Sequence, residues 1–170
     1  MKSALRASDP REDIITHLGE MRAFARSLTR NAVSADDLVQ DTIEKAWRGF
    51  HTFRPGTNLR AWLFTILRNT HYTNLRKTKG AQIVPVEPLA EELVGHPGGD
   101  TYIAMIDFER ALGMLPVEQR EALVLIGASG LSYQDAAQTC GVSIGTIKSR
   151  VNRGRARLAA LLGRQRDDMG

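Results

Sequence analysis

Hydrophobic residues recur every three or four positions along most of the chain, the spacing that places them on one face of an α-helix. In the first half this pattern predicts a helix over residues 9–30, a second that begins at Ser34, and a third over residues 59–77. Asp9 can cap the first helix, and the RPG sequence at 54–56 interrupts the pattern before the third. No segment shows a convincing β alternation, so the predicted fold class is all-α.

The helical pattern stops over residues 80–100, which contain three prolines and four glycines, and resumes at about Tyr102. This organisation predicts two small helical domains, residues 10–80 and 102–165, joined by a linker over residues 81–101. The linker also holds short apolar patches, which can lie against a domain: Ile83, Val84, Val86, Leu89 and Leu93.

The C-terminal part of the chain carries two consecutive capped helices. Ser132 can cap the first, Gly141 can end it in a left-handed conformation, and Ser143 can cap the second. This plan is typical of a helix–turn–helix, which places its second helix in the DNA major groove. Small or apolar residues stand where the two helices must pack: Ala136, Ala137, Cys140, Val142 and Ile147.

The second of these helices carries charge of one sign only, because residues 143–158 contain five basic side chains and no acidic one. On a helical wheel its apolar positions share a narrow sector: Ile144, Ile147, Val151 and Leu158. The opposite side presents donors for phosphates and base edges, and nothing there repels phosphate. Those candidate readers are Thr146, Ser149, Arg150, Arg153 and Arg157, with Asn152 at one edge.

Charge along the whole chain is segregated in the same way. Residues 10–80 carry a net charge of +5, residues 81–109 of −6 and residues 110–170 of +4. Two basic blocks on either side of an acidic one favour a polyanionic partner over a solvated surface of mixed sign.

Composition narrows the function classes further. The single cysteine, Cys140, excludes an internal disulfide and a thiolate metal cluster, and the four histidines are dispersed. There is no phosphate loop and no nucleophile–base pairing, so we expect neither catalysis nor a metal or other cofactor. No apolar run suggests a membrane span or a secretory signal, and we expect a cytoplasmic protein.

The predicted helix over residues 59–77 also has a basic side. Arg68, Tyr72 and Arg76 share a sector with Thr65 and Asn69, away from most of the apolar residues. An aromatic ring can stack on an unpaired base while arginine holds the phosphate, which suits DNA whose strands are separated. An ordinary solvated helix face is the alternative that these residues alone leave open.

Three segments of the chain together resemble an extracytoplasmic-function (ECF) sigma factor of RNA polymerase. They are DDLVQDTIEKAW (Asp36–Trp47), FRPGTNLRAWLFTILRNTHYTNLRK (Phe53–Lys77) and LPVEQREALVLIGASGLSYQDAAQTCGVSIGTIKSRVNRGRARL (Leu115–Leu158). The resemblance covers nearly the whole chain, with the blocks in the family's order and spacing. Within these segments, the sequences LFTILRNTHYTNLRK and EQREALVLIGASGLSY are similar to those of the subgroup that drives the general stress response in alphaproteobacteria.

The resemblance implies a sigma-2 domain followed by a sigma-4 domain, in a chain that directs core RNA polymerase to promoters and is not itself an enzyme. In the family the DLVQD helix docks on the clamp coiled coil of the β′ subunit, and the β flap is a second contact. The matching positions are Asp37, Leu38, Gln40 and Asp41, although Asp37 also suits the first turn of a capped helix.

Promoter DNA is the other partner that the resemblance implies. For the −10 element, the loop before the long helix supplies Thr57, Asn58 and Arg60, and the helix supplies Asn69, Tyr72, Asn74, Arg76 and Lys77. For the −35 element, expected to be GGAAC-like, the positions are Thr146, Lys148, Ser149, Arg150, Arg153 and Arg157.

The resemblance further implies a small anti-sigma protein as a partner, and two other interpretations stay open. The first is a sigma-like decoy that binds an anti-sigma factor and never touches DNA. The chain has no length for the receiver domain of such decoys, and its DNA-facing positions are basic, so both observations count against it. The second is an operator-binding regulator that needs no polymerase.

Overall fold

The structure is a computed structural model that describes residue 9, residues 11–79 and residues 99–167. All its regular elements are helices, which confirms the predicted all-α fold class. The apolar patches of the linker (Ile83, Val84, Val86, Leu89 and Leu93) lie outside the described residues.

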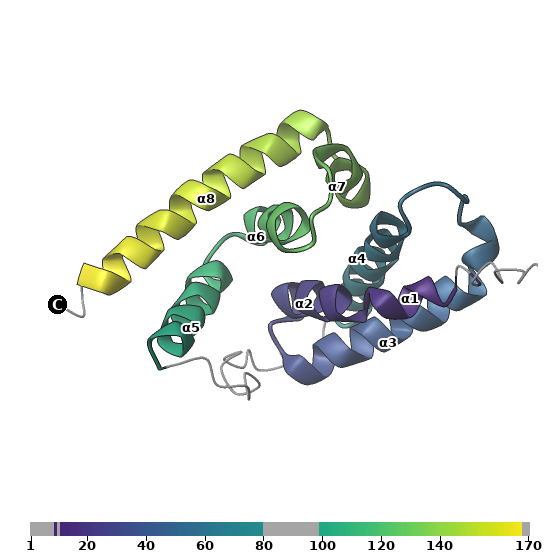
Figure 1. Ribbon diagram of the computed structural model, residues 1–170, viewed down its shortest axis with the longest axis horizontal. Coiled ribbons are helices and arrows are strands. Elements are labelled where there is room, and N and C mark those ends of the chain that lie inside the picture. The colour runs from purple at the N-terminus through teal and green to yellow at the C-terminus, as the bar shows by residue number, and fades with distance from the viewer. Residues whose placement is uncertain (1–8, 10, 80–98, 168–170) are drawn as a thin grey trace, which may run out of the picture.

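The helices form two groups along the chain, which we call the first and second modules (Figure 1). The first module comprises α1 (Asp13–Thr16), α2 (Leu18–Thr29), α3 (Ala32–Arg48), a short 3₁₀ turn η1 (Phe50–Thr52) and α4 (Leu59–Lys77). The second comprises α5 (Gly99–Gly113), α6 (Val117–Leu123), a π-helical turn η3 (Val124–Ala128), α7 (Tyr133–Cys140) and α8 (Ile144–Asp167).

The first two predicted helices differ from the structure at their N-terminal ends. The helix predicted over residues 9–30 is interrupted at His17, whose backbone leaves the helical region, and Asp9 accepts from the Arg11 amide rather than capping a long helix. The second helix begins before Ser34, because Asn31 is its cap and accepts a hydrogen bond from the Ser34 amide at 2.9 Å.

The later predictions agree more closely. Helix α4 spans the predicted residues 59–77, and α5 begins at Gly99, slightly before the expected Tyr102. Ser132 caps α7 and Gly141 ends it at a φ of 66°, the left-handed conformation that glycine adopts without a Cβ penalty. Ser143 accepts from the Thr146 amide at 3.1 Å and so caps α8, which confirms the helix–turn–helix.

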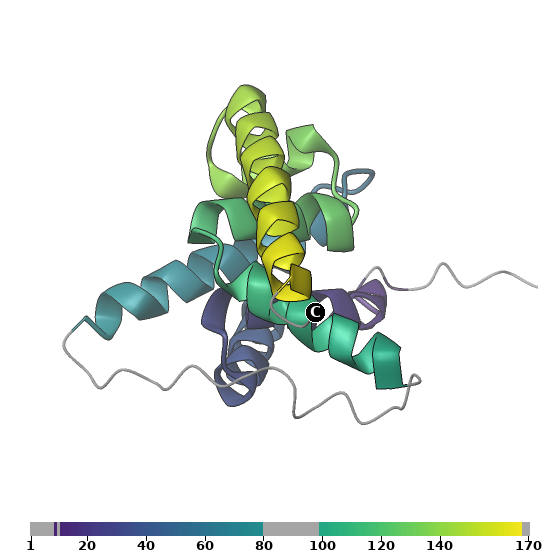
Figure 2. The same cartoon turned by 90° about the vertical axis from the view of Figure 1, so that its left-hand side faces the viewer.

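The buried side chains of the two modules form one continuous apolar cluster. In the first module Phe24 and Phe64 meet with ring centroids 5.3 Å apart, and in the second Leu125 of η3 and Ile147 and Val151 of α8 are fully buried. Helix α4 of the first module lies against α7 of the second, whereas α8 runs along the side of the second module away from the first (Figures 1 and 2).

Two large hydrophobic residues are on the surface, Trp47 of α3 and Ile144 of the predicted apolar sector of α8. Trp47 is 53% exposed and Ile144 is 43% exposed. Trp47 lies near the end of α3, where the Arg11 guanidinium is 5.4 Å from its ring centroid. Ile144 occupies the first turn of α8.

Candidate nucleic-acid and polymerase interfaces

Helix α8 presents a polar and basic surface opposite its buried residues. Ile147 and Val151 are fully buried, while Ser149 and Arg153 are exposed on the other side of the helix. The residues that share this surface, which we call the α8 face, are Thr146, Ser149, Arg150, Arg153 and Arg157. Lys148 is also exposed but projects from a different side, together with Arg155.

The rest of the second module fixes the orientation of α8. A Cβ at Gly154 would lie 3.0 Å from the Leu123 side chain, so α6 and α8 approach closely at this glycine. The capping bonds of Ser132 and Ser143 set the angle of α7 and of the turn that precedes α8. Within the α8 face Ser149, Arg153 and Arg157 are exposed, whereas Thr146 and Arg150 are half-buried.

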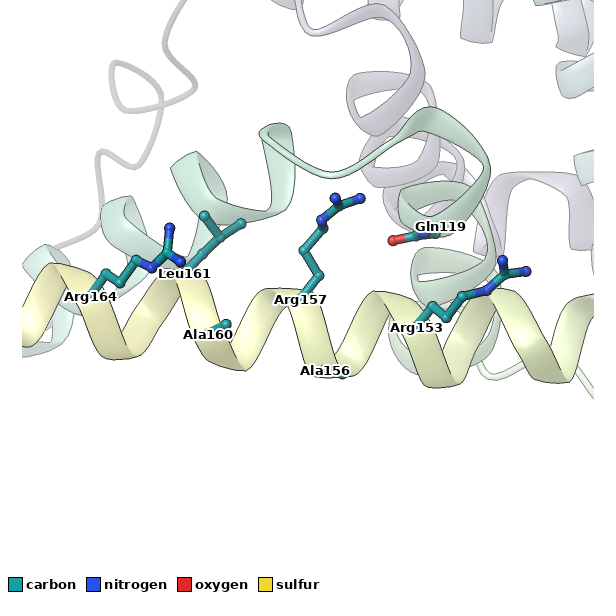
Figure 3. Close-up of a pocket in the computed structure, with 7 residues that line it drawn as sticks. All are labelled: Gln119, Arg153, Ala156, Arg157, Ala160, Leu161 and Arg164. Carbon is teal, nitrogen blue, oxygen red and sulfur yellow. The ribbon is translucent and has the colours of Figure 1, made fainter.

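Arginines continue along α8 beyond the helix–turn–helix, where Arg153, Arg157 and Arg164 form a row beside a groove of about 610 Å³ between α8 and α6. Figure 3 shows Arg157 and Arg164 projecting from the same side of α8, with Ala160 and Leu161 between them. Gln119 of α6 lines the groove opposite Arg153. The row adds positive charge along the helix axis where a phosphate backbone could follow it.

The loop before α4 is built on an aromatic cluster of Phe50, Phe53 and Trp62, whose ring centroids lie 5.4 to 6.0 Å apart. Within the loop Thr57 donates to the Arg54 carbonyl at 2.6 Å, and its side chain remains exposed. Asn58 caps α4 by accepting from the Ala61 amide at 3.2 Å. The loop is thus a defined turn that presents Thr57 and Asn58 at the start of α4.

The predicted −10 residues within α4 do not all share one side of the helix. Asn69, Arg76 and Lys77 are exposed, whereas Asn74 is half-buried on the side opposite Arg76. Tyr72 is half-buried beside Arg68, whose guanidinium lies 4.6 Å from the ring centroid. Burial raises the pKa of the Tyr72 hydroxyl, so this ring is a neutral stacking partner near neutral pH.

The start and middle of α4 contact the second module. Arg68 forms two hydrogen bonds with the Glu121 carboxylate, of 2.7 and 3.3 Å, and the Glu121 side chain is fully buried. Arg60 donates to the Gly130 carbonyl and also to Glu20, both at 3.3 Å. Asn58 donates to Asp135 at 3.1 Å. Two residues assigned to −10 DNA, Asn58 and Arg60, therefore have protein partners in this structure.

Electrostatics reinforce the Arg68–Glu121 contact. Burial by itself would lower the pKa of Arg68, but the hydrogen bond and charge of Glu121 outweigh it and raise that pKa. Burial also raises the pKa of the Cys140 thiol to about 11, with Glu121 nearby as a second cause. Cys140 is therefore an unreactive thiol in the core, as its position in the sequence suggested.

Helix α3 presents an acidic stripe, although one residue assigned to it is buried. Asp37, Gln40 and Asp41 are exposed, but Leu38 is only 3% exposed and packs in the core. The helix turns the Leu38 side chain inward in this structure, and the assignment of Leu38 to a polymerase contact stays a prediction. On the side of α3 that also carries the exposed Arg48, six further residues are exposed, which we call the α3 stripe: Val33, Asp37, Gln40, Asp41, Glu44 and Trp47.

The sequence reasoning missed three members of the α3 stripe. Val33 is 68% exposed at one end and Trp47 lies at the other, and Glu44 between them pairs with Arg48 within the helix. Their spacing from Asp37 and Gln40 along a helical wheel was a signal that could have found them. A surface of carboxylates flanked by exposed apolar residues is suited to protein contact.

Comparison with known proteins assigns the two modules to a family. Residues 14–80 match the family model of sigma-70 region 2, and residues 105–158 match that of sigma-70 region 4. The chain is 49% identical over 152 residues to the ECF RNA polymerase sigma factor EcfG of Rhodopseudomonas palustris (strain TIE-1), covering 89% of this chain and 84% of that protein. The chain belongs to the ECF RNA polymerase sigma factors.

Two solved complexes have similar structures. The sigma factor RpoE of Bartonella quintana, in complex with the anti-sigma factor NepR, matches this sigma factor with a TM-score of 0.78 and 45% identity, over 92% of this chain and 98% of that one. CnrH in complex with the cytosolic domain of CnrY matches with a TM-score of 0.66 and 28% identity, over 92% and 91% of the two chains.

Membership in the family confirms that the chain is a transcription initiation factor and not an enzyme. In residues 11–79 and 99–167, His, Cys, Asp and Glu side chains do not gather in threes as metal ligands would. None of the helices in these same ranges combines the length and apolar character needed to cross a bilayer.

Proposed function

We propose that this sigma factor directs core RNA polymerase to promoters with a GGAAC-like −35 element, which the α8 face reads in the major groove. The observation that carries the proposal is the α8 face itself, where the exposed Ser149, Arg153 and Arg157 are flanked by the half-buried Thr146 and Arg150 on a capped helix. Arginine donates to guanine and to phosphate, and no acidic side chain interrupts the row.

In this proposal the first module, residues 10–80, opens the −10 element and the second, residues 102–165, anchors the upstream DNA. Thr57 and Asn58 capture an unpaired base at the loop, while Tyr72 and Arg76 hold the strand along α4. The energy needed to unstack a base, a few kcal/mol per step, is offset by stacking and phosphate contacts and requires no hydrolysis.

The α3 stripe is the proposed docking surface for the clamp coiled coil of the polymerase β′ subunit, with Asp37, Gln40 and Asp41 as its charged and polar centre. The apolar ends, Val33 and Trp47, supply the desolvated contacts that usually dominate affinity. The second module is expected to contact the β flap.

We further propose control by a small anti-sigma protein within a general stress response in the cytoplasm. The similarity to RpoE, solved in complex with the anti-sigma factor NepR, and to EcfG supports this part of the proposal. Co-purification from unstressed cells should yield a small protein bound to the sigma factor. Recovery of core polymerase alone would contradict this part.

Run-off transcription tests the central proposal. Core polymerase, a template with a GGAAC −35 element and this protein should together give a discrete transcript that any two of the three do not give. A transcript of equal strength from a template with a scrambled −35 element would contradict it. Tight footprinting of the promoter by the protein alone, without transcription, would instead support an operator-binding regulator.

The Asp41→Ala variant tests the α3 stripe. Loss of this exposed carboxylate should weaken binding to core polymerase by about tenfold, since charged contacts at protein interfaces commonly contribute 1–2 kcal/mol or more. Affinity for an isolated −35 duplex should stay unchanged. Glu12→Ala, which removes an exposed carboxylate outside the stripe, is the matched control.

A further inference from the structure

The first two turns of α8 carry an exposed isoleucine beside polar residues. Ile144 is 43% exposed, and Gly145, Lys148 and Ser149 are exposed as well. Lys148 follows Ile144 by four positions and Ser149 follows Gly145 by four, so the four residues are neighbours on the surface at the start of the helix. We call this surface the α8 tip.

Ile144 differs from the apolar residues that hold α8 in place. Ile147 and Val151 are fully buried and belong to the core. Ile144 leaves almost half of its side chain in solvent, so that part gains nothing from packing within the protein. In a helix–turn–helix the first residues of the second helix face the base edges in the major groove. An apolar group of DNA in that groove could therefore cover Ile144.

Gly145 indicates that a ligand approaches the helix at the same place. A Cβ built at this position would meet only the Ser143 hydroxyl oxygen, at 3.8 Å, so no other neighbour among the described residues opposes a side chain there. Its φ also lies outside the left-handed region that favours glycine. Glycine destabilises a helix relative to alanine, and it is used where a backbone must approach a ligand closely. The edge of a base pair beside Ile144 is such a ligand.

The polar groups of the α8 tip narrow the choice of base. The Thr146 hydroxyl lies 2.9 Å from the Ser143 hydroxyl, whose oxygen also accepts from the Thr146 amide at 3.1 Å, so this hydroxyl is already engaged in the cap. Lys148 and Ser149 remain as exposed donors, with Ile144 as the apolar group between them and the cap. In the major groove thymine presents both an acceptor, O4, and an apolar group, the C5-methyl.

We propose that Ile144 is a specificity-determining residue of this sigma factor, which contacts the C5-methyl groups of thymines in the −35 element. The inference rests on the proposed function, in which α8 reads a GGAAC-like sequence. The two adenines of that sequence pair with two thymines on the other strand, whose methyl groups project into the major groove. Burial of these methyl groups against Ile144 removes apolar surface from water on both sides of the contact.

Deoxyuridine tests the contact, because it differs from thymidine only in lacking the C5-methyl group. Fluorescence anisotropy compares binding of the full chain to a GGAAC duplex and to the same duplex with deoxyuridine in place of both thymines opposite the adenines. The native chain should bind the deoxyuridine duplex about tenfold more weakly, since each buried methyl-sized group contributes a factor of about four. Equal binding of the two duplexes would overturn the proposal.

The Ile144→Ala variant should lose this discrimination. It should bind both duplexes with one affinity, close to that of the native chain for the deoxyuridine duplex, because Ile144 and the methyl groups stabilise the complex through each other. Ile15→Ala, the matched control, makes the same change at an exposed isoleucine of the first module and should keep the native preference. A preference for thymine that persists in Ile144→Ala would show that another residue reads the methyl groups, and would overturn the proposal.

Two further variants guard against a change of fold. Circular dichroism checks that Ile144→Ala is helical, and Ile144→Val, which retains a smaller branched side chain, should show an intermediate preference for thymine. Gly145→Ala should bind both duplexes several-fold more weakly, while its thermal unfolding temperature stays unchanged or rises, since the added Cβ meets only the Ser143 hydroxyl. Unchanged DNA affinity in Gly145→Ala would contradict a base pair at this position.

A duplex with a scrambled −35 element separates failure of this inference from failure of the proposed function. A strong preference for GGAAC over the scrambled duplex, with no effect of deoxyuridine, would overturn only the role of Ile144. Equal affinity for the GGAAC and scrambled duplexes would contradict the proposed function itself. Loss of run-off transcription in Ile144→Ala, with duplex binding and thymine preference unchanged, would overturn the proposal and place Ile144 in a protein contact.

Discussion

Helices α4 and α8 are both basic, but Arg68 in the middle of α4 is covered by the second module, whereas Arg153 of α8 is exposed. Arg153 on α8 is exposed and bonds only to the carbonyl of Ser149 one turn earlier, among the contacts resolved for it, whereas Arg68 on α4 is bound to the buried Glu121. Clustered positive charge therefore marks a surface for polyanions, but it does not say whether that surface is free. An acidic residue from another part of the chain can occupy it first.

The largest effect is expected for DNA binding by the open helix. Arg150→Ala/Arg153→Ala should weaken binding to a −35 duplex about 100-fold, because each lost contact to a base or phosphate costs about 1–3 kcal/mol. Fluorescence anisotropy measures this, and Arg155→Ala, on another side of α8, is the control. A loss for Arg155→Ala as large as that for the pair would show that only total charge matters.

The arginines of α4 and α8 should differ in the rate at which a reagent in solution modifies them. Phenylglyoxal should modify Arg153 and Arg157 about tenfold faster than Arg68 and Arg120, since the latter two become accessible only when the modules part. Mass spectrometry of time points gives the rates. Equal rates at Arg68 and Arg153 would remove the distinction between a covered and an open helix.

The turn that orients α8 has a smaller expected effect. Gly141→Ala should lower the free energy of unfolding by about 1 kcal/mol, because its φ of 66° is unfavourable for a side chain. Gly163→Ala, within α8 and with open space around it, should be neutral or slightly stabilising. Thermal unfolding measures both, and equal destabilisation would argue against a left-handed turn at Gly141.

The smallest expected effect is a pH dependence of the free energy of unfolding, which arises from His71 near the contact between the two modules. Burial, with the charges of Arg68 and Arg120 nearby, lowers the pKa of His71 below its ordinary value. The unfolded chain then binds the proton more readily, so the free energy of unfolding should be greatest above about pH 6.5 and decrease as the pH falls through that value.

Urea unfolding between about pH 5 and pH 8 measures this dependence, and His71→Gln should reduce the slope over that range. The exposed His51 provides the control, because His51→Gln should leave the slope unchanged. If the free energy of unfolding changed with pH to the same extent in the native chain and in His71→Gln, the assignment of this dependence to His71 would be contradicted.

Local features of the fold were predictable because their signals are local. The caps at Ser132, Gly141 and Ser143 depend on neighbours within a few residues, and α4 was predicted with its observed bounds. The break at His17 was not, since apolar spacing continues through it and tertiary packing decides the kink.

The candidate sites were predictable only in part. Hydrophobic periodicity distinguished the two sides of α8. Leu38 was assigned to the polymerase contact only from its position in the family's motif, and the structure places its side chain in the core. The contact between the modules was missed altogether. Arg68 and Glu121 are 53 positions apart, and Thr65 and Thr139 are 74 apart, so no local pattern links them.

The α3 stripe lies outside the surface that joins the modules, and its carboxylates remain in solvent while α4 is covered. The proposed polymerase contact is therefore accessible in the same arrangement that covers Arg68, so docking at the α3 stripe would not require the two modules to separate first.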